Sequence, residues 1–340
     1  MSKVLVTGGA GFIGSHLCDA LLARGDQVTA VDSYTTFYDK AVKLENTESA
    51  VKAGADFIEA DVTNHQAMHD VFAHARPEAV IHLAAWAGVR PSILAPALYA
   101  HQNVCGTQNI LDVCIKHGVD RVVIASSSSV YGNNKKVPFA EADDVSNPIS
   151  PYAATKVATE LLARTASNLH GLPTTILRFF TVYGPRQRPD LAIRKFMALI
   201  ASGKPIPAYG DGSTSRDYTY CDDICSGVLA ALDRCGSCET CRTYNLGGEH
   251  PVTLLDLIRE IEQVMGRSAD IQWMPEQAGD VTRTWADISR ARAELGYEPR
   301  TTLSAGLARQ WGWLNEQPSR LSVSSDVTAG LSRAAALPST

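Results

Sequence analysis

The chain of 340 residues has no long hydrophobic run, no long basic run and no excess of positive charge. Because no apolar stretch approaches the ~20 residues that cross a bilayer, we expect no membrane-spanning helix. The formal net charge of −5 at pH 7 gives no reason to expect a nucleic-acid partner. Residues 1–3 lead at once into a short apolar run and a glycine cluster, which is too short for a signal peptide. We therefore expect a cytoplasmic protein.

Cysteines are few, but three of them recur at one spacing. Cys235, Cys238 and Cys241 stand three residues apart and have the donor type that zinc prefers, with another cysteine or a histidine as the fourth ligand. A structural zinc site normally shows two paired knuckles, which this segment lacks. We therefore interpret it as a cysteine-rich surface loop and expect no metal.

A glycine-rich turn between a strand and a helix is the strongest local signal. Residues 3–7 form a β-branched run that leads into the stretch from Gly8 to Gly14, and a helical pattern follows over 15–24. A second apolar strand, residues 27–31, ends in Asp32. This order is the one required for dinucleotide binding. Asp32 favours NAD over NADP, because an acid repels a 2′-phosphate and no arginine follows immediately.

The first half of the chain alternates strands with helices. Further strands are expected at 56–60, 79–83, 121–125 and 174–180. Further helices are expected at 65–74, at 96–117 and around Tyr152. This alternation predicts an α/β fold, a Rossmann-type doubly wound parallel sheet with a smaller C-terminal α/β lobe. We assign residues 1–180 to a cofactor domain, to which 222–250 should return. Residues 181–316 form a substrate lobe, and 317–340 form a tail.

Ligands of such sheets bind beyond the carboxyl ends of the strands. Asp61 follows its strand where an acid can reach an adenine amino group, although an N-cap at Thr63 explains the local pattern almost as well. The expected cofactor-binding residues are Gly8, Gly11, Phe12, Ile13, Gly14, Asp32, Ser33, Asp61, Val62, Leu83, Ala84, Ala85, Asn103, Tyr152 and Lys156.

Tyr152 and Lys156 lie four residues apart in a segment that reads as helix, so both side chains share one face. A tyrosine of ordinary pKa, about 10, is a poor base at neutral pH. A positive charge beside it favours the phenolate and lowers that pKa. The pair is therefore a candidate general base, whereas an isolated pair of this kind is more often plain helix surface.

Four motifs in order give the chain a family resemblance: residues 7–14, residues 82–85, the Tyr152/Lys156 pair, and residues 216–220 leading to 222–223. This pattern resembles the extended short-chain dehydrogenase/reductase family, specifically the nucleotide-sugar epimerases, up to about residue 314. The resemblance implies that Ser127 hydrogen-bonds the reacting hydroxyl and that Tyr152 removes its proton. It also implies that Lys156 holds the nicotinamide ribose and depresses the pKa of Tyr152.

Two serines distinguish this chain from relatives that go on to other reactions. Dehydratases of this type carry Asp-Glu at the positions of Ser128 and Ser129, and UDP-glucuronate decarboxylases carry a glutamate at the second. Because this chain lacks those acids, the 4-keto sugar should turn over and take the hydride back on its other face. The resemblance therefore implies epimerisation rather than elimination or decarboxylation.

Three residues match the family's nucleotide-binding positions. Arg216 matches the arginine that grips the diphosphate, Tyr209 the aromatic that packs on uracil, and Asp280 the acid that holds the uridine ribose. Each has an ordinary alternative, since Arg216 can pair with Asp217 and Tyr209 can belong to the core. Together, at family spacing, they favour binding of a UDP-sugar.

The sugar itself is indicated by departures from UDP-glucose 4-epimerases. Residues 277–280 read Gln-Ala-Gly-Asp where those enzymes typically read Arg-x-Gly-Asp, and residues 87–90, 178–185 and 188–192 look like UDP-glucuronate 4-epimerases. Thr181, with the serines at 127–129, offers hydroxyls to a sugar carboxylate. By charge alone, the candidate carboxylate partners are Arg90 and Arg188.

The resemblance therefore implies an NAD-dependent 4-epimerase that interconverts UDP-glucuronate and UDP-galacturonate. A UDP-glucose/UDP-galactose 4-epimerase is the alternative, and a UDP-glucuronate decarboxylase and a non-catalytic NAD-binding sensor are weaker ones. Sensors of that kind usually lose the tyrosine or the lysine, and this chain keeps both. Relatives typically form homodimers through the helices that correspond to 96–117 and 152–170.

Overall fold

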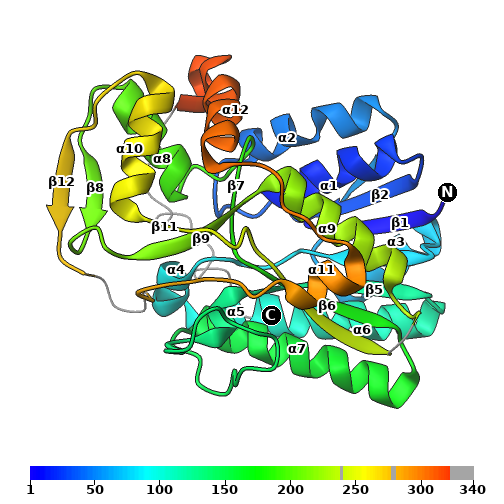
Figure 1. Ribbon diagram of the computed structural model, residues 1–340. Coiled ribbons are helices and arrows are strands. Elements are labelled where there is room, and N and C mark those ends of the chain that lie inside the picture. Colours follow the sequence, from blue (N-terminus) through cyan, green and yellow to red (C-terminus); the bar gives the residue numbers. More distant parts are fainter. Residues whose placement is uncertain (238–239, 277–280, 322–340) are drawn as a thin grey trace.

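A seven-stranded parallel sheet forms the centre of the computed structural model, which describes residues 1–237, 240–276 and 281–321 (Figure 1). Its strand order is β10-β6-β5-β4-β1-β2-β3, which contains the doubly wound order 3-2-1-4-5-6. Its strands are β1 Lys3–Thr7, β2 Gln27–Asp32, β3 Asp56–Glu59, β4 Ala79–His82, β5 Arg121–Ser127, β6 Thr174–Phe179 and β10 Cys241–Leu246. The predicted fold class is confirmed.

Helices cover the two faces of this sheet, because successive side chains of each buried strand point to opposite faces. Val4 and Val6 of β1 belong to one apolar cluster, whereas Leu5 belongs to the other. The first cluster lies beneath α1 Phe12–Ala23, α2 Lys40–Lys52, α9 Cys221–Arg234 and α11 Ser289–Leu295. The second lies beneath α3 His65–Ala75, α6 Gly106–His117 and α7 Pro151–His170.

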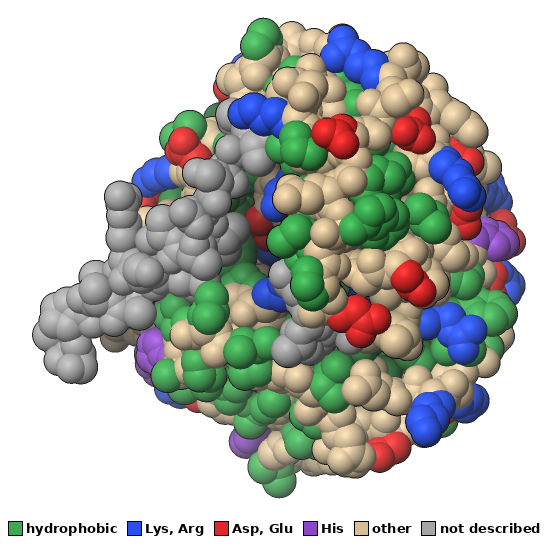
Figure 2. Space-filling model, turned by 90° about the vertical axis from the view of Figure 1, so that its left-hand side faces the viewer, with side chains coloured by type: hydrophobic (Ala, Val, Ile, Leu, Met, Phe, Trp, Pro, Cys, Tyr) green, Lys and Arg blue, Asp and Glu red, His purple; other side chains and the backbone are tan. Residues whose placement is uncertain are grey.

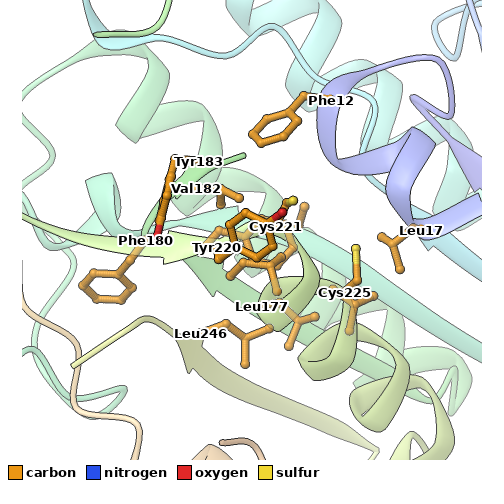
Figure 3. Packing of buried hydrophobic residues seen from close by; sticks show 14 of the residues in the cluster. Phe12, Leu17, Leu177, Phe180, Val182, Tyr183, Tyr220, Cys221, Cys225 and Leu246 are labelled. Atoms are coloured by element: carbon orange, nitrogen blue, oxygen red, sulfur yellow. The ribbon is translucent and has the colours of Figure 1, made fainter. Parts of the chain in front are cut away.

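The first cluster extends from the sheet into the C-terminal lobe. Leu17 of α1 and Cys225 of α9 lie in the same layer of side chains, with Leu177 of β6 beside them (Figure 3). Tyr183 and Tyr220 continue this layer, and their rings meet edge to face with centroids 5.6 Å apart. The lobe is thus joined to the cofactor domain by a continuous apolar core.

The expected helix over 96–117 is divided into three parts. It begins with α5 Pro96–Tyr99, passes through a π-helical turn over Ala100–Cys105, and continues as α6. Asn103 lies in this turn, and its amide donates to the carbonyl oxygen of Trp86 and to Thr155 Oγ1, both at 3.0 Å. A π-turn inside a helix often marks a functional region, and here it places one amide between two neighbouring elements.

The C-terminal lobe is more regular than the sequence predicts. It contains a three-stranded sheet, ordered β11-β9-β7, and a two-stranded one, β12-β8. Its strands are β7 Thr181–Tyr183, β8 Ile206–Tyr209, β9 Ser215–Tyr220, β11 Pro251–Thr253 and β12 Ile271–Met274. The short helix α4 Val89–Leu94 faces this lobe, whose own helices are α8 Ala192–Ala201, α10 Leu254–Met265 and α12 Leu303–Asn315.

Within the described ranges, no helix has the length and apolar character needed to cross a membrane. On the face shown in Figure 2, basic side chains lie among acidic ones rather than in one patch. A 3-10 turn, Pro318–Leu321, carries Arg320, whose Nε donates to Glu45 Oε1 at 2.5 Å.

Candidate active site

The glycine turn leaves room for a ligand at the start of α1. Gly8 has a φ of +73°, and a Cβ added there would lie 2.9 Å from the backbone nitrogen of Ala84. A Cβ on Gly14 would lie 2.2 Å from the carbonyl oxygen of Gly8. The glycines therefore let the turn pack tightly against Ala84 and the start of α1, which begins at Phe12, and residues 8 and 11–14 line an open cavity. This cradle fits the diphosphate of a dinucleotide.

A cavity of about 350 Å³ extends from this cradle across the carboxyl ends of the strands. It joins the two ends of the predicted site, because the glycine turn and the Tyr152/Lys156 pair line the same space. The expected site residues that line it are Gly8, Gly11, Phe12, Ile13, Gly14, Asp32, Ser33, Val62, Leu83, Ala84, Ala85, Ser127, Tyr152, Lys156, Thr181 and Arg188. Others that line it were not expected, among them Phe37, Lys43 and Trp86.

Asp32 ends β2 as predicted, but it is not an isolated acid. Its Oδ1 accepts a hydrogen bond from the backbone N–H of Tyr34 at 2.8 Å and forms a buried ion pair with Lys43 Nζ at 3.0 Å. Lys43 lies on α2, eleven residues after Asp32, whereas the sequence argument considered only an arginine directly after that acid. Its ammonium offsets part of the negative charge on which the predicted preference for NAD over NADP rests.

His82 connects two of the sequence motifs through a chain of hydrogen bonds. Its Nδ1 lies 2.7 Å from Thr7 Oγ1, and its Nε2 lies 3.0 Å from Thr107 Oγ1. Thr107 donates its hydroxyl hydrogen to the carbonyl oxygen of Asn103, so its oxygen accepts from His82 Nε2–H. His82 is therefore neutral, with Nδ1 accepting from Thr7, and burial lowers its pKa to about 3.

Two expected cofactor residues lie outside the wall of the cavity. Asp61 Oδ1 accepts from both the backbone N–H and the hydroxyl of Thr63, at 2.8 Å each. The N-cap of α3 is Asn64 rather than Thr63, which corrects the alternative interpretation of that segment. Asn103 is 1 % exposed, and its amide group is engaged by Trp86 and Thr155. Asn103 therefore does not line the cavity itself but holds Trp86, which does.

The reaction end is built by a strand end and a helix start. Ser150 caps α7 by accepting from the backbone N–H of Ala153 at 3.1 Å, and Pro151 occupies the first turn, where a missing N–H costs nothing. Tyr152 follows at once, in the first turn of the capped helix. Ser127 ends β5, accepts from the backbone N–H of Ser129 at 3.2 Å, and is hydrogen-bonded through its side chain to Tyr152.

The pKa of Tyr152 differs from the expectation. Burial raises it above the ordinary value, while the hydrogen bond with Ser127 and the charge of Arg188 act in the opposite direction. The sequence predicts that Lys156 lowers it. In the structure the ammonium of Lys156 is instead directed at the carbonyl oxygen of Ala125, to which it donates at 2.8 Å. The cation that acts on the phenol is Arg188.

Lys156 is buried, and burial lowers its pKa to about 8 although Glu160 raises it. Glu160, one turn further on, receives two hydrogen bonds from Arg178, at 2.7 and 2.9 Å, and one from Ser126 Oγ at 2.6 Å. Arg178 is 1 % exposed. This buried network fixes the end of β5 against α7 and so sets the distance between Ser127 and the Tyr152/Lys156 pair.

The two distinguishing serines follow Ser127 in a 3-10 turn, Ser128–Tyr131. Ser129 Oγ is buried and has no hydrogen-bond partner among the described residues. Thr181 opens β7 and also lines the cavity, two residues after Phe179, which pairs with Ser127 across β5 and β6. A carboxylic acid at either serine position would place an acid/base group close to Ser127. The hydroxyl groups found there cannot do that chemistry.

Arg188 enters the cavity from the C-terminal lobe. It forms a fork with Asp190, with Nε 3.0 Å from Oδ1 and Nη2 2.8 Å from Oδ2, and Nη1 takes no part in this pair. Its guanidinium stacks over the ring of Phe37, 4.7 Å from the centroid. Its charge reaches Tyr152. Of the two arginines expected near the sugar, this is the one at the reaction end.

The other expected substrate residues lie apart from this cavity. Arg90 of α4 stacks over the ring of Tyr209, 4.5 Å from the centroid. These two expected substrate residues therefore contact each other. Arg216 lies on β9, where it pairs with Val252 of β11. The carboxylate of Asp217 accepts from the backbone N–H groups of Gly248, Glu249 and Ala286. Asp280 lies outside the described residues.

The cysteine-rich segment follows α9, at the opposite end of the strands from the cavity. The thiol of Cys235 is 3.6 Å from the carbonyl oxygen of Val122, and the side chain is buried. Cys241 begins β10, and Cys238 lies outside the described residues. Cys235 is thus part of the packing beneath the sheet rather than of an exposed loop, which corrects that part of the prediction.

The geometry describes a dinucleotide cradle joined to a serine, tyrosine and lysine in one cavity. Residues 4–247 match the NAD dependent epimerase/dehydratase family, and the chain belongs to it. The predicted family is confirmed.

Relatives within the family are similar along almost their whole length. A UDP-glucuronate 4-epimerase of Thermodesulfobacterium geofontis is 41% identical over 318 residues, which are 93% of this chain and 97% of the relative. The UDP-glucuronic acid 4-epimerase of Bacillus cereus, solved with UDP-glucuronic acid and NAD, has a TM-score of 0.85 and 35% identity, covering 92% of this chain and 99% of its own. The UDP-glucose 4-epimerase of Thermotoga maritima, solved with UDP-glucose, has the same TM-score at 33% identity, with coverage of 92% and 98%.

Proposed function

We propose that this protein is an NAD-dependent 4-epimerase that interconverts UDP-glucuronate and UDP-galacturonate. The observation that carries the proposal is that Ser127, Tyr152 and Lys156 line the same cavity as the glycine cradle. The similarity to the T. geofontis and B. cereus enzymes supports the same substrate. The reaction oxidises one carbon of the sugar and reduces it again, with no net redox change.

The residues that hold the cofactor follow from the cavity. We assign the cofactor diphosphate to the glycine cradle, the adenosine ribose hydroxyls to Asp32 and the nicotinamide ribose to Lys156, and the support is that all three line the cavity. NAD held there would supply the hydride chemistry that oxidises sugar C4 and reduces it again on the opposite face. The pocket must therefore let a 4-keto sugar turn between the two transfers.

Tyr152 acts as the base on the sugar 4-hydroxyl, and Ser127 hydrogen-bonds the same oxygen. As the proton leaves for Tyr152, negative charge develops on O4, and a fixed hydroxyl donor stabilises it. Arg188 assists because its positive charge favours the phenolate of Tyr152. In the return step Tyr152 gives the proton back to O4, so the base is regenerated in each turnover.

We assign the sugar carboxylate to Thr181 and Arg188, which line the cavity, and to Ser128 and Ser129, which do not line it but follow the lining residue Ser127 in the next turn. Ser129 Oγ is a buried hydroxyl without a partner among the described residues, and Arg188 offers Nη1 beyond its pair with Asp190. Because Asp190 offsets the charge of Arg188, the carboxylate meets hydroxyl groups and a compensated cation. This arrangement holds the uronate without an acid/base group that would help it lose carbon dioxide.

The nucleotide is assigned to the C-terminal lobe, with Arg216 on the diphosphate, Tyr209 on uracil and Asp280 on the uridine ribose. Arg90 stacks on the Tyr209 ring and so orients it, which supports a nucleotide-binding role for that aromatic. We assign residues 1–180 and 222–250 to the cofactor domain and 181–316 to the substrate lobe. In support, β10 pairs with β6.

A homodimer in the cytoplasm is the assembly and location that we infer. Helix α7 carries two exposed leucines, Leu161 at 59% and Leu169 at 72% exposure, which pairing with a second copy would cover. The thiol of Cys18 is buried, which raises its pKa to about 12 and keeps it protonated, as expected of a packing cysteine in a reducing compartment. Light scattering of the purified protein tests the dimer.

Incubation with UDP-glucuronate, followed by NMR of the product sugar, tests the activity. A C4-inverted uronate supports the proposal, whereas a UDP-pentose means decarboxylation. No change with UDP-glucuronate, together with conversion of UDP-glucose to UDP-galactose, would establish the alternative 4-epimerase. That second candidate is kept because the T. maritima UDP-glucose 4-epimerase has the same TM-score as the B. cereus enzyme.

A further inference from the structure

Trp86 borders the cavity in a fixed position. It follows β4 after Ala85, and its backbone is held on both sides by one amide, because Trp86 N–H donates to Asn103 Oδ1 at 2.7 Å and Asn103 Nδ2 donates to the Trp86 carbonyl oxygen at 3.0 Å. Asn103 is in turn held by Thr155 of α7. The position of Trp86 is therefore fixed relative to the helix that carries Tyr152.

The indole ring is fixed as well. It meets Phe37 edge to face, with centroids 5.3 Å apart, and Tyr99 in the same way at 6.0 Å. Tyr99 then meets the ring of Tyr152, with centroids 6.3 Å apart. Edge-to-face contacts of this kind stabilise aromatic clusters beyond their buried area. Trp86 is 6% exposed, so its ring has little room to turn.

The polar atom of this ring is the unexplained feature. Trp86 Nε1 is buried and has no hydrogen-bond partner among the described residues. A buried N–H without an acceptor is costly, and most such groups in folded proteins are paired. Trp86 lines the cavity, so the missing acceptor can come from a molecule bound there. Because neighbouring atoms cover Nε1, such a molecule reaches it through a small shift of the packing around the ring.

The neighbourhood indicates what kind of acceptor it is. An indole N–H only donates, so its partner must present a lone pair. Arg188 stacks on the other wall of the same corner, with its guanidinium 4.7 Å from the centroid of Phe37. Arg188 and Lys43 line the same cavity as this N–H donor, each paired with a carboxylate, and a donor in such surroundings favours a negatively charged oxygen.

We propose that Trp86 Nε1–H donates a hydrogen bond to an anionic oxygen of a nucleotide ligand in this cavity. Within the proposed function such an oxygen belongs to the diphosphate of the cofactor, or to the diphosphate or carboxylate of the UDP-sugar. Trp86 is thus a binding residue in addition to those that the motifs supply. It holds an anion between the cofactor end and the reaction end of the cavity.

Trp86→Phe tests the proposal, because it removes the N–H and keeps an aromatic ring between Phe37 and Tyr99. Trp311→Phe on α12 is the matched control, since it removes an indole N–H that does not line the cavity. The quantities measured on the purified holoenzyme are retention of NAD on dialysis, the Kd values of UDP and UDP-glucuronate, and KM for UDP-glucuronate and UDP-glucose. Loss of one hydrogen bond to a charged group weakens binding about ten-fold or more.

The affected quantity identifies the oxygen. Loss of NAD retention assigns the cofactor diphosphate, a parallel rise of the UDP Kd and of both KM values assigns the substrate diphosphate, and a rise for UDP-glucuronate alone assigns the carboxylate. Unchanged values in Trp86→Phe would overturn the proposal. NAD retention and the Kd values of UDP and UDP-glucuronate are measured without turnover, so they decide the role of Trp86 even if the unmodified enzyme epimerises neither sugar.

If Trp86→Phe fails to fold, NMR of the unmodified protein tests the same proposal. The indole N–H signal of Trp86 in the unmodified protein, one of five tryptophan signals, is assigned with selectively labelled tryptophan and should move downfield when NAD or UDP-glucuronate is added. An indole signal that stays in place with every ligand contradicts the proposal.

Discussion

The imidazole of His82 lies with Nδ1 2.7 Å from Thr7 Oγ1, and this contact joins the end of β4 to the residue that precedes the glycine turn. The two residues are direct neighbours in the pairing of β1 with β4. Thr7 Oγ1 also accepts from the backbone N–H of Ala84 at 3.3 Å. A neutral histidine thus holds together the two segments that form the floor of the cofactor cradle.

This arrangement predicts a specific pH dependence of stability. Burial lowers the pKa of His82 to about 3 in the folded protein, against about 6.5 when unfolded. The unfolded state therefore binds the extra proton between these values, and the stability that His82 contributes is present above pH 6.5 and lost as the pH falls towards 3. At pH 4.5 the loss amounts to about 3 kcal/mol of unfolding free energy.

Urea unfolding at pH 7 and pH 4.5 measures this effect. His82→Gln should be less stable at pH 7, and the difference in unfolding free energy between the two pH values should shrink by about that amount. The exposed His74 provides the control, since His74→Gln should leave the difference nearly unchanged. An unaltered pH difference in His82→Gln would show that His82 is not the titrating group.

The ion pair of Lys43 with Asp32 predicts how cofactor choice responds to its removal. Lys43→Met leaves the carboxylate uncompensated, so a 2′-phosphate should be repelled more strongly, and the ratio of the NADP Kd to the NAD Kd should rise about ten-fold or more. Fluorescence titration with each cofactor gives this ratio. Lys40→Met is the control on the same helix, because Lys40 pairs with Glu59 at the surface. A ratio that stays constant or falls in Lys43→Met contradicts this account of Asp32.

Arg188 should matter more for the uronate than for the neutral sugar. In Arg188→Met, kcat/KM should fall at least about ten-fold more for UDP-glucuronate than for UDP-glucose, because one charge-assisted hydrogen bond is lost to the carboxylate alone. The pH at which activity rises should also move upward, since the charge of Arg188 lowers the pKa of Tyr152. Arg90→Met, by contrast, should weaken both sugars equally through Tyr209. Equal losses for both sugars in Arg188→Met would remove it from the carboxylate site.

The sequence predicts six of the seven strands of the main sheet, because each of those is a local apolar run bounded by turns. It does not predict β10, whose residues Cys241–Leu246 are largely polar. It gives no sign of α2, whose buried face consists largely of polar residues. That helix is fixed by the ion pair of Lys43 with Asp32 and by the hydrogen bond from Asn46 Nδ2 to the Ala10 carbonyl oxygen, at 3.3 Å. Contacts between residues far apart in sequence leave no periodic pattern.

The candidate site, like the fold, is predictable from the sequence only in part. Ser127, Tyr152, Lys156 and the glycine turn are recognisable because each belongs to a motif of fixed spacing. The directions of side chains in the site cannot be recognised from the sequence. The ammonium of Lys156 is held by the Ala125 carbonyl oxygen, and Trp86 is held by Asn103 in a π-helical turn. The pKa of Tyr152 could not be predicted either, because it depends on burial and on Arg188 from another lobe.

The assignment of Tyr152 as the base is the central claim, and Tyr152→Phe tests it most directly. The ring remains in its contact with Tyr99 and loses only the hydroxyl that meets Ser127. The variant should keep its fold and its bound NAD, and C4 inversion of UDP-glucuronate followed by NMR should slow by about three orders of magnitude. Turnover within ten-fold of the unmodified enzyme would contradict the account.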